Sequence, residues 1–373
     1  MIFSWKKPYD VVFYYPQHFN RGKNNTNPFF DPLIEACEKN GLRYKVLEEP
    51  DSNTSYKRNS KASRFDFWMY MVILLRKLGS RFIKDEARRD QTIGEIISFL
   101  SFNQFKANSY ITISNSMINV LLGLNTKADV YDLQHGIIYS WHWGYFNKDG
   151  VLNKNLSNKR IHFLVNGKGY KDIFYKHNSN LKNSKVYVLG GVDNIISKSD
   201  VRRKDVLYTL QITPDLSKDE LIAEKDKLEK FLSSVENDFI ANNITLLLKH
   251  HPRFNNVIDL DEMLTRFSFV KITNLSLDDL FSKVFLHITL SSTSVFEFAL
   301  AGIPSYIIPN LHGEKIFFNE YEFPKSTMNL ENLITSYKSN DTNFKNYSAE
   351  VKKWAESYYE KFDEKLLIKL LKK

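Results

Sequence analysis

The segment Val284–Ile308, VFLHITLSSTSVFEFALAGIPSYII, decides the fold class of the chain. Its first apolar run, Phe285–Ile288, leads into a polar turn and then a helical stretch over Ser294–Ala301. A second apolar run, Ser305–Ile308, follows directly after Gly302. A strand, a helix and another strand in immediate succession predict two parallel strands joined by a crossover helix.

The same alternation continues along almost the whole chain in both directions. We expect further strands at Val11–Tyr15, Arg43–Leu47, Tyr110–Ser114, Val130–Leu133, Ile161–Val165, Val186–Leu189, Val206–Leu210, Ile244–Leu248 and Phe269–Ile272. We expect further helices at Pro28–Asn40, Arg64–Lys84, Asp90–Phe102, Lys218–Ala241, Leu277–Lys283 and Ser348–Lys372. The pattern predicts an α/β protein with parallel sheets covered by helices, and the strands are too many for one sheet of ordinary size.

A polar, charged stretch at Ile195–Lys204 separates the strand at Val186–Leu189 from a new strand at Val206–Leu210. We therefore expect an N-terminal α/β domain over residues 1–200 and a C-terminal α/β domain over residues 201–373. A length of 373 residues suits two domains of common size.

The overall composition excludes several classes of protein. Hydrophobic residues make up 43% and charged residues 25%, which is incompatible with a wholly disordered or collagen-like chain. The single cysteine, Cys37, excludes a disulfide framework and a cysteine-rich zinc module. The net charge of +9 favours an anionic partner, but the sequence has no nucleic-acid-binding motif, and we expect no nucleic acid to bind.

The N-terminus and the longest apolar run bear on location. The N-terminus has no apolar core of a secretory signal, and the run Phe67–Leu75 is far too short to span a membrane. We therefore expect a cytoplasmic protein. Residues 57–89 interleave ten Lys and Arg residues with aromatic ones, which indicates either a helix at the anionic inner face of the cytoplasmic membrane or an ordinary helix with solvated basic flanks.

Ligands of open α/β sheets bind beyond the carboxyl ends of the strands, so the residues that follow each strand are the candidates for a site. In the C-terminal half the strand Ile244–Leu248 leads into Lys249, His250, His251, Pro252 and Arg253. Imidazole and cationic side chains there can bind a phosphate. The alternative is a solvated basic turn.

Four hydroxyl residues, Ser291–Ser294, stand where the next strand of that half passes into a helix, and Glu297 follows one turn later. Hydroxyls and unpaired amides at a helix N-terminus can bind an anion, and Glu297 is placed to accept hydrogen bonds from sugar hydroxyls. The alternative is an ordinary helix cap, although a cap requires one hydroxyl only. Gln211, which follows the strand Val206–Leu210, is a further candidate at this edge.

The N-terminal half has one comparable stretch, DLQHGIIYSWHWGYF, at Asp132–Phe146. His135 could act as a general base because an imidazole titrates near neutral pH, and Gly136 would permit a positive φ or a close ligand approach. The aromatic residues offer the surfaces that bind sugars, although they could equally pack a core. The candidates here are Asp132, Gln134, His135, Gly136, His142 and Tyr145.

In this order, the Gln-His-Gly loop, the His-Pro pair and the Ser-Ser/Thr turn resemble bacterial surface-polysaccharide transferases. These are the capsule Kdo transferases, the bacterial sialyltransferases and the teichoic-acid glycerophosphotransferases, and the resemblance covers about residues 110–310. It implies the GT-B architecture, in which two Rossmann-like domains face a cleft and the C-terminal one holds the donor nucleotide. In such a fold we expect the C-terminal helix to pack back toward the N-terminal domain.

The resemblance also implies roles for individual residues. His251 and Pro252 would hold the donor phosphate and nucleotide, Ser291, Ser292 and Thr293 the phosphate oxygens, and Glu297 the ribose. His135 would act on the acceptor side. The acidic motif that carries the base in sialyltransferases has no equivalent, so the base stays open between His135, Asp132 and another carboxylate.

The expected activity is transfer of a sugar from a nucleotide donor to a hydroxyl of a surface glycan or a lipid-linked glycan. The donor we favour is a CMP-activated acidic sugar: sialic acid, Kdo or another nonulosonate. CDP-glycerol or CDP-ribitol transfer, a sugar-nucleotide epimerase of the same fold and a non-catalytic synthase subunit are the alternatives. We expect no metal and no other cofactor, because the only close match to an Asp-x-Asp motif, Asp259–Asp261, begins a predicted helix. The stereochemical outcome and the oligomeric state stay open.

Overall fold

The computed structural model describes residues 7–51, 56–176, 178, 185–191, 203–212, 216–250 and 258–372. The chain divides into two compact units, the first made of Met1–Val192 and Glu360–Lys373 and the second of Asp193–Tyr359. The expected C-terminal domain included the whole C-terminus, whereas the residues from Glu360 onward group with the first unit.

The first unit contains a seven-stranded parallel sheet in the order β3-β2-β1-β4-β5-β6-β7. Its strands are β1 (Tyr9–Pro16), β2 (Tyr44–Glu49), β3 (Ser63–Arg64), β4 (Ala107–Thr112), β5 (Asp129–Leu133), β6 (Ile161–Val165) and β7 (Val186–Val188). Its helices are α1 (Asp31–Lys39), α2 (Asp66–Gly79), α3 (Glu86–Leu100), α4 (Ile118–Leu124), α5 (Lys168–Lys176) and α13 (Glu364–Leu371). Sequence analysis did not predict β3, α4 or α5.

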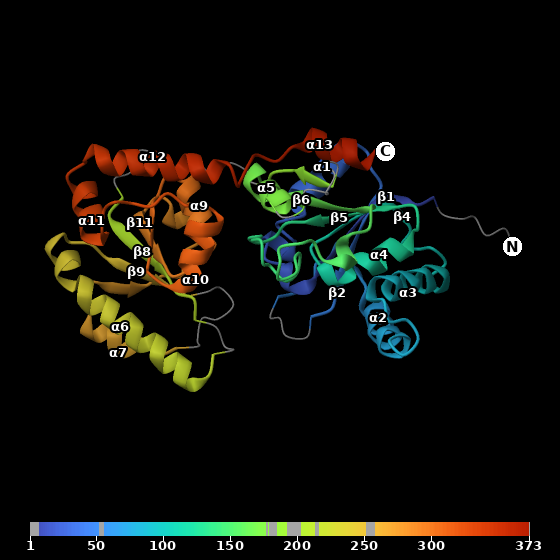
Figure 1. The fold of residues 1–373 in the computed structure, drawn as a ribbon, viewed down its shortest axis with the longest axis horizontal. Coiled ribbons are helices and arrows are strands. Elements are labelled where there is room, and N and C mark those ends of the chain that lie inside the picture. The colour runs from blue at the N-terminus through green and yellow to red at the C-terminus, as the bar shows by residue number, and fades with distance from the viewer. Residues whose placement is uncertain are drawn as a thin grey trace. The chain divides into compact units, whose positions relative to one another are not determined.

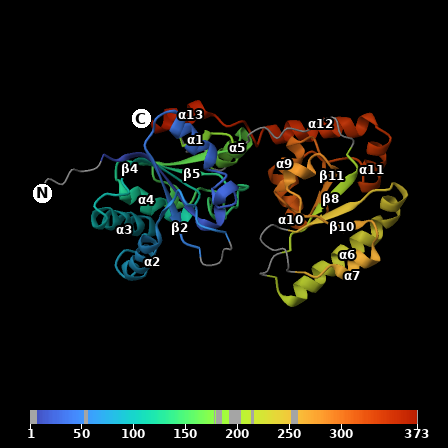
Figure 2. The same ribbon diagram turned by 180° about the vertical axis from the view of Figure 1, so that it is seen from behind.

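Alternation along β1 assigns the helices to the two faces of this sheet. Phe13 lies in the hydrophobic core that α1 and α13 close, whereas Tyr14 packs on Phe65 and its hydroxyl lies 3.9 Å from the sulfur of Met69 on α2. Figures 1 and 2 show α1 and α13 on one side of the sheet and α2, α3 and α4 on the other. Both faces are covered, which explains why the strands read as continuous apolar runs.

The second unit contains a five-stranded parallel sheet in the order β10-β9-β8-β11-β12. Its strands are β8 (Asp205–Thr209), β9 (Leu246–Lys249), β10 (Val270–Ile272), β11 (Val284–Thr289) and β12 (Ser305–Ile307). Its helices are α6 (Lys218–Ala241), α7 (Asp261–Arg266), α8 (Leu277–Leu280), α9 (Ser294–Leu300), α10 (Leu311–Gly313), α11 (Leu330–Lys338) and α12 (Thr342–Glu356), with a π-helix at Glu314–Glu320. Phe231 of α6 packs on Tyr208 at one face, and Phe298 of α9 stacks on His287 at the other.

The helix expected over Ser348–Lys372 is two helices, α12 and α13, because the chain passes between them from the second unit to the first. The expected packing of the C-terminal helix is confirmed, since Leu367 and Leu370 belong to the core of the first unit. The backbone at Lys361 passes so close to Gly190, whose φ is 73°, that a Cβ there would lie 2.1 Å from the Lys361 carbonyl oxygen.

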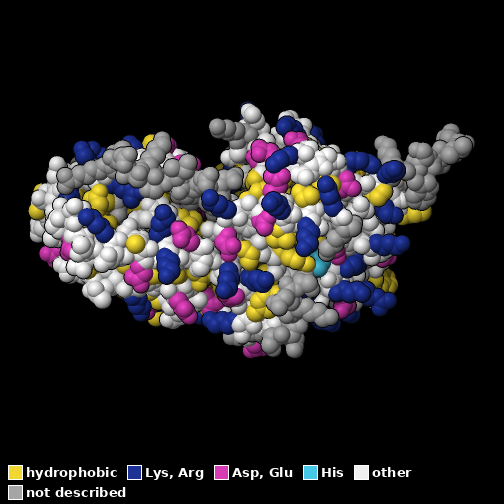
Figure 3. Space-filling view, turned by 90° about the horizontal axis from the view of Figure 1, so that it is seen from above, with side chains coloured by type: hydrophobic (Ala, Val, Ile, Leu, Met, Phe, Trp, Pro, Cys, Tyr) yellow, Lys and Arg dark blue, Asp and Glu magenta, His cyan; other side chains and the backbone are white. Residues whose placement is uncertain are grey.

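Lys and Arg side chains are intermixed with Asp and Glu on the face that Figure 3 displays. The excess of positive charge is therefore not gathered into one continuous patch on that face. Within the described residues, no helix combines the length and the apolar composition needed to cross a membrane.

Candidate functional site

Each sheet reverses its strand order at one place, and parallel sheets bind ligands at the carboxyl ends of the strands at such a place. In the first unit the reversal lies between β1 and β4, and in the second between β8 and β11. The residues that follow these strands form the two candidate sites, which we describe separately.

Gln211 and Ser291 join the two strands of the second unit at its reversal point. Gln211 follows β8 and Ser291 follows β11, and the Gln211 Oε1 accepts hydrogen bonds from the Ser291 amide and, at 3.0 Å, from the Ser291 hydroxyl. One side chain therefore fixes the start of the hydroxyl-rich loop to the neighbouring strand. Sequence analysis selected both residues as ligand contacts, and the structure places both at the carboxyl edge of the sheet.

A buried histidine, His287, holds the Ser294 hydroxyl directly and the Ser292 hydroxyl through Ser294. His287 on β11 bonds Thr209 at 2.9 Å, Ser305 at 2.8 Å and Ser294 at 3.3 Å. Ser294 in turn bonds the Ser292 hydroxyl at 2.8 Å. Burial lowers the pKa of His287 to about 3, so this imidazole is neutral and structural.

At the turn into α9, fewer backbone amides lack a hydrogen-bond partner than the sequence indicates. The Val295 amide donates to the Ser292 carbonyl, the Phe296 amide to the Thr293 carbonyl and the Ser294 amide to the Ser292 hydroxyl. Thr293 is the helix cap, its side chain makes no capping bond, and it is exposed. Thr293 is thus the hydroxyl of this loop that is open to a ligand.

Glu297 on α9 carries a shielded oxygen. Within the described residues its Oε2 has no hydrogen-bond partner, and burial raises the pKa of Glu297 to about 7. A carboxyl group in such a place gains from a ligand that donates hydrogen bonds, as the hydroxyls of a ribose do.

Lys249 ends β9, and His250 follows it at the same edge. The Lys249 ammonium donates to the Leu275 carbonyl oxygen at 2.6 Å, and burial lowers the pKa values of Lys249 and His250. The remaining candidates of this loop, His251, Pro252 and Arg253, lie outside the described residues, so their roles stay predictions.

His135 follows β5 in the first unit, and its ring contacts Phe19, which follows β1. Its ring stands edge-on to Phe19 with the centroids 5.1 Å apart, and the side chain is exposed. Although the residue as a whole is exposed, its ring packs against Phe19 and Phe29, and this desolvation lowers the pKa of His135. The neighbouring His142 and His18 lower this pKa further, and a hydrogen bond with the Leu133 backbone raises it. The imidazole is therefore neutral at pH 7 and can accept a proton.

Gln134 and Gly136 flank this histidine in different ways. Gln134 is buried, donates to the Gly136 carbonyl oxygen at 2.8 Å and accepts from the Asn166 amide at 2.9 Å, so it shapes the loop. Of the two roles considered for Gly136, a positive φ does not apply, because its φ is not positive, and a close ligand approach stays open. A Cβ on Gly136 would have no atom within 4 Å, which leaves space beside His135.

Asp132 lies beneath this loop, buried next to Tyr145. Burial raises the pKa of Asp132 to about 7, and interaction with the Tyr145 hydroxyl partly offsets the effect. Neither carboxyl oxygen of Asp132 has a hydrogen-bond partner among the described residues, so its contact with Tyr145 is weak. Asp132 is buried and therefore less accessible to a substrate than His135.

His142 and its neighbours form the aromatic part of the loop. The His142 ring contacts Tyr139 and Tyr145 with centroids 5.1 and 5.2 Å apart, and its Nδ1 accepts from the Gly144 amide at 3.2 Å. Desolvation lowers the pKa of His142. Tyr145 packs in the core and Trp143 is exposed, so core packing and surface exposure both occur in this one loop.

Sequence analysis missed two residues at this edge, His18 and Asn115. His18 follows β1 and its Nδ1 lies 2.7 Å from Asp51 Oδ2; Asn115 follows β4 and donates to the Gly144 carbonyl oxygen at 3.3 Å. The rule that residues after a strand are candidates would have found both.

No three His, Cys, Asp or Glu side chains come together as metal ligands would in the part of the chain that the structure describes.

Comparison with known proteins supports the fold. No protein-family profile matches the sequence, and no curated protein matches it. Three similar solved structures are a proposed UDP-N-acetylglucosamine 2-epimerase from Listeria monocytogenes, a UDP-GlcNAc 2-epimerase from Neisseria meningitidis bound to UDP-GlcNAc, and the wall teichoic acid polymerase TagF.

The similarity to these structures extends over whole chains. The first has 12% identity and a TM-score of 0.60 over 98% of this chain and 96% of its own. The second has 13% identity and a TM-score of 0.57 over 97% of this chain and 99% of its own. The third has 13% identity and a TM-score of 0.55 over 98% of this chain and 88% of its own. At these identities the similarity establishes the fold: two Rossmann-like units of the GT-B type.

Proposed function

We propose that this chain is a glycosyltransferase that moves a sugar from a nucleotide donor to a hydroxyl of a surface glycan. The second unit would hold the donor, with Thr293, Lys249 and His250 near its phosphate and Glu297 near its ribose. The observation that carries the proposal is the hydrogen bond that the Ser291 hydroxyl donates to Gln211. This bond holds a polar loop at the place where the strand order of the sheet reverses.

His135 of the first unit would act as the general base that takes the proton of the acceptor hydroxyl. Its exposure and neutral state support this role, whereas the Asp132 carboxyl is buried. Hydrogen-bond donors at the second-unit site would stabilise the departing phosphate. His251 would add to these donors, as the sequence resemblance implies, and so would Arg253, whereas Pro252 has no N–H to donate and would hold the loop rigid.

Among donors we favour a CMP-activated acidic sugar, on the resemblance of the His-Pro and Ser-Ser/Thr motifs. The runner-up activities are CDP-glycerol or CDP-ribitol transfer and epimerisation of a sugar nucleotide. Both have the support of a similar fold, since the similar structures include the teichoic acid polymerase TagF and an epimerase bound to UDP-GlcNAc.

A thermal-shift panel of CMP, CDP, UMP, UDP and GDP tests the donor site, because a ligand of the native state raises the melting temperature. We expect CMP or CDP to stabilise the protein most. Thr293→Val should reduce that stabilisation, whereas Thr126→Val, at an exposed threonine of the first unit, should not. A panel without any shift would refute nucleotide binding.

Incubation with the donor nucleotide alone separates the activities. An epimerase would release an altered sugar without an acceptor, whereas a transferase requires an acceptor for turnover. Product formation from the donor alone, at the same rate with and without acceptor, would exclude the transferase.

A further inference from the structure

Helix α2 exposes a row of apolar side chains to solvent, whereas Val72 and the ion pair of Arg76 with Asp90 face the protein. Phe67, Tyr70, Leu74 and Leu78 recur at a helical spacing and are all exposed. Val72 is the one side chain of α2 that is fully buried. We call the four exposed residues the α2 stripe.

Two ion pairs fix the orientation of α2 at its two ends. At the N-terminal end, Asp66 lies 3.0 Å from the Arg58 guanidinium. Near the C-terminal end, Arg76 makes a two-point contact with Asp90 of α3, at 3.0 and 2.6 Å. The bidentate contact between Arg76 and Asp90 has a defined geometry, so the α2 stripe cannot turn inward without breaking it.

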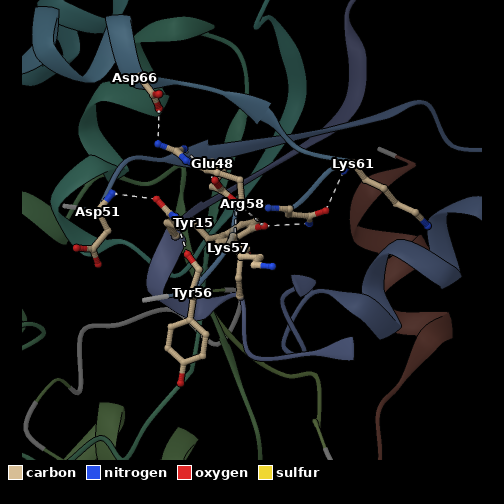
Figure 4. Close-up of polar contacts among 11 residues, drawn as sticks. Tyr15, Glu48, Asp51, Tyr56, Lys57, Arg58, Lys61 and Asp66 are labelled. Carbon is tan, nitrogen blue, oxygen red and sulfur yellow. Dashed lines mark hydrogen bonds and ion pairs between the residues drawn. The ribbon is translucent and has the colours of Figure 1, made fainter. Parts of the chain in front are cut away.

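Arg58 is itself held by a buried carboxylate. Glu48 accepts hydrogen bonds from Arg58 at 2.9 Å, from the Asn59 amide at 3.0 Å and from the Asn20 side chain at 2.7 Å. Figure 4 shows Arg58 between Glu48 and Asp66. The N-terminal end of α2 is therefore tied, through Arg58 and Glu48, to strand β2 of the sheet.

Four cationic residues lie within and just after α2, before the acidic pair Asp85 and Glu86. The segment 67–84 contains Arg76, Lys77, Arg81 and Lys84 and no Asp or Glu. Arg76 is paired with Asp90, while Lys77, Arg81 and Lys84 are exposed next to the exposed Phe82. An apolar stripe with a cationic border fits an anionic surface.

We propose that α2 docks this protein on an anionic phospholipid bilayer, with the α2 stripe in the interfacial region and Lys77, Arg81 and Lys84 against the headgroups. A second copy of the chain fits the surface less well, because a symmetric contact would bring the same cations together. The proposal is independent of the proposed function, since docking requires no donor or acceptor. It would, however, bring a transferase to a lipid-linked acceptor.

Co-sedimentation with vesicles tests the docking. We expect the full chain to sediment with phosphatidylcholine vesicles that contain phosphatidylglycerol and to remain in solution with phosphatidylcholine alone or at high salt. Neutralising two cations, in Lys77→Gln with Arg81→Gln, should weaken partitioning about 25-fold, at roughly fivefold per cation. Lack of sedimentation at low salt would overturn the proposal.

A matched pair of variants tests the stripe itself. Leu74→Ser with Leu78→Ser removes two aliphatic side chains that are 49% and 47% exposed, and should weaken partitioning on the order of tenfold or more. Ile222→Ser with Ile240→Ser on α6 removes two that are 52% and 54% exposed, and should leave it unchanged. Circular dichroism of both variants confirms folding.

Two results would contradict docking through α2. Equal binding of the two double variants would place the lipid contact elsewhere. If the stripe variants instead abolish a dimer seen by sedimentation velocity, and vesicles do not bind, the α2 stripe joins copies of the chain.

Discussion

His135 combines exposure with a depressed pKa, and this combination gives a test by pH. A base must be neutral to act, and an imidazole is neutral above its pKa. Because the pKa of His135 is lowered from 6.5, we expect the acid limb of the kcat/KM profile below pH 6.5. The measurement is the pH–rate profile of sugar transfer.

The His135→Gln variant supplies the control. It keeps a polar side chain but no titratable nitrogen, so turnover should fall on the order of 10²-fold or more and its acid limb should disappear. An acid limb that persists in the Gln variant would assign the titration to another group, with Asp132 as the next candidate.

The raised pKa of Glu297 predicts that the stability of the second unit depends on pH in the opposite direction to that caused by a salt-bridged carboxylate. Its pKa is raised from 4.5 to about 7 in the folded chain, so its contribution to stability is complete below pH 4.5 and is lost as the pH rises through 7. Glu297→Gln should therefore stabilise the second unit at pH 8 by on the order of 2 kcal/mol relative to its effect at pH 4.5. Urea unfolding at the two pH values measures the difference, and an equal effect at both would show that Glu297 is not desolvated.

At the scale of elements, α3 and α4 cross at a contact that requires two glycines. A Cβ on Gly94 would lie 2.1 Å from the Val120 carbonyl oxygen, and one on Gly123 would lie 2.0 Å from the Gln91 carbonyl oxygen. These distances are far below any real Cβ contact, so the helices could not keep their present separation.

We expect Gly94→Ala to destabilise the first unit by about 2 kcal/mol, because the strain of the overpacked contact outweighs the better helix propensity of alanine. Gly136→Ala is the matched control, since its Cβ meets no atom within 4 Å. Chemical denaturation of both variants provides the comparison. Equal stability of the two would mean that α3 and α4 can separate freely.

At the scale of the whole molecule, the chain returns to its first unit after completing the second. Leu367 on α13 is fully buried in the core of the first unit, together with Val11 and Cys37. Leu367→Ala should therefore lower the stability of the first unit by roughly 3 kcal/mol. The reciprocal variant is Leu232→Ala on α6, which removes an equally buried side chain from the second unit.

Hydrogen exchange resolved by peptide separates the two effects. Leu367→Ala should accelerate exchange in β1 and β4, and Leu232→Ala should accelerate it in β8 and β11. If either variant accelerates exchange equally in both sheets, the two units unfold together and do not behave as separate folding units.

The sequence by itself determined the α/β class, the positions of the long strands along the chain and the strand ends at which a site could lie. These features depend on local pattern: strands buried on both faces read as apolar runs, and polar residues after a run mark its carboxyl end. Gln211, Ser291 and His135 were found in this way. His18 and Asn115 follow strands as well and were within reach of the same rule.

Only the tertiary structure decided which of these side chains are already engaged and which are open. Gln211 meets Ser291 from 80 positions away, and His287 bonds hydroxyls from three elements. The Gln134 side chain donates to Gly136 of its own loop and accepts from the distant Asn166 amide. The outward apolar side of α2 and the division of the last helix depend likewise on distant partners, Asp90 and the core around Val11. The local pattern of apolar and polar residues determines whether a segment forms a helix or a strand. Contacts with remote segments determine what each side of that helix or strand packs against.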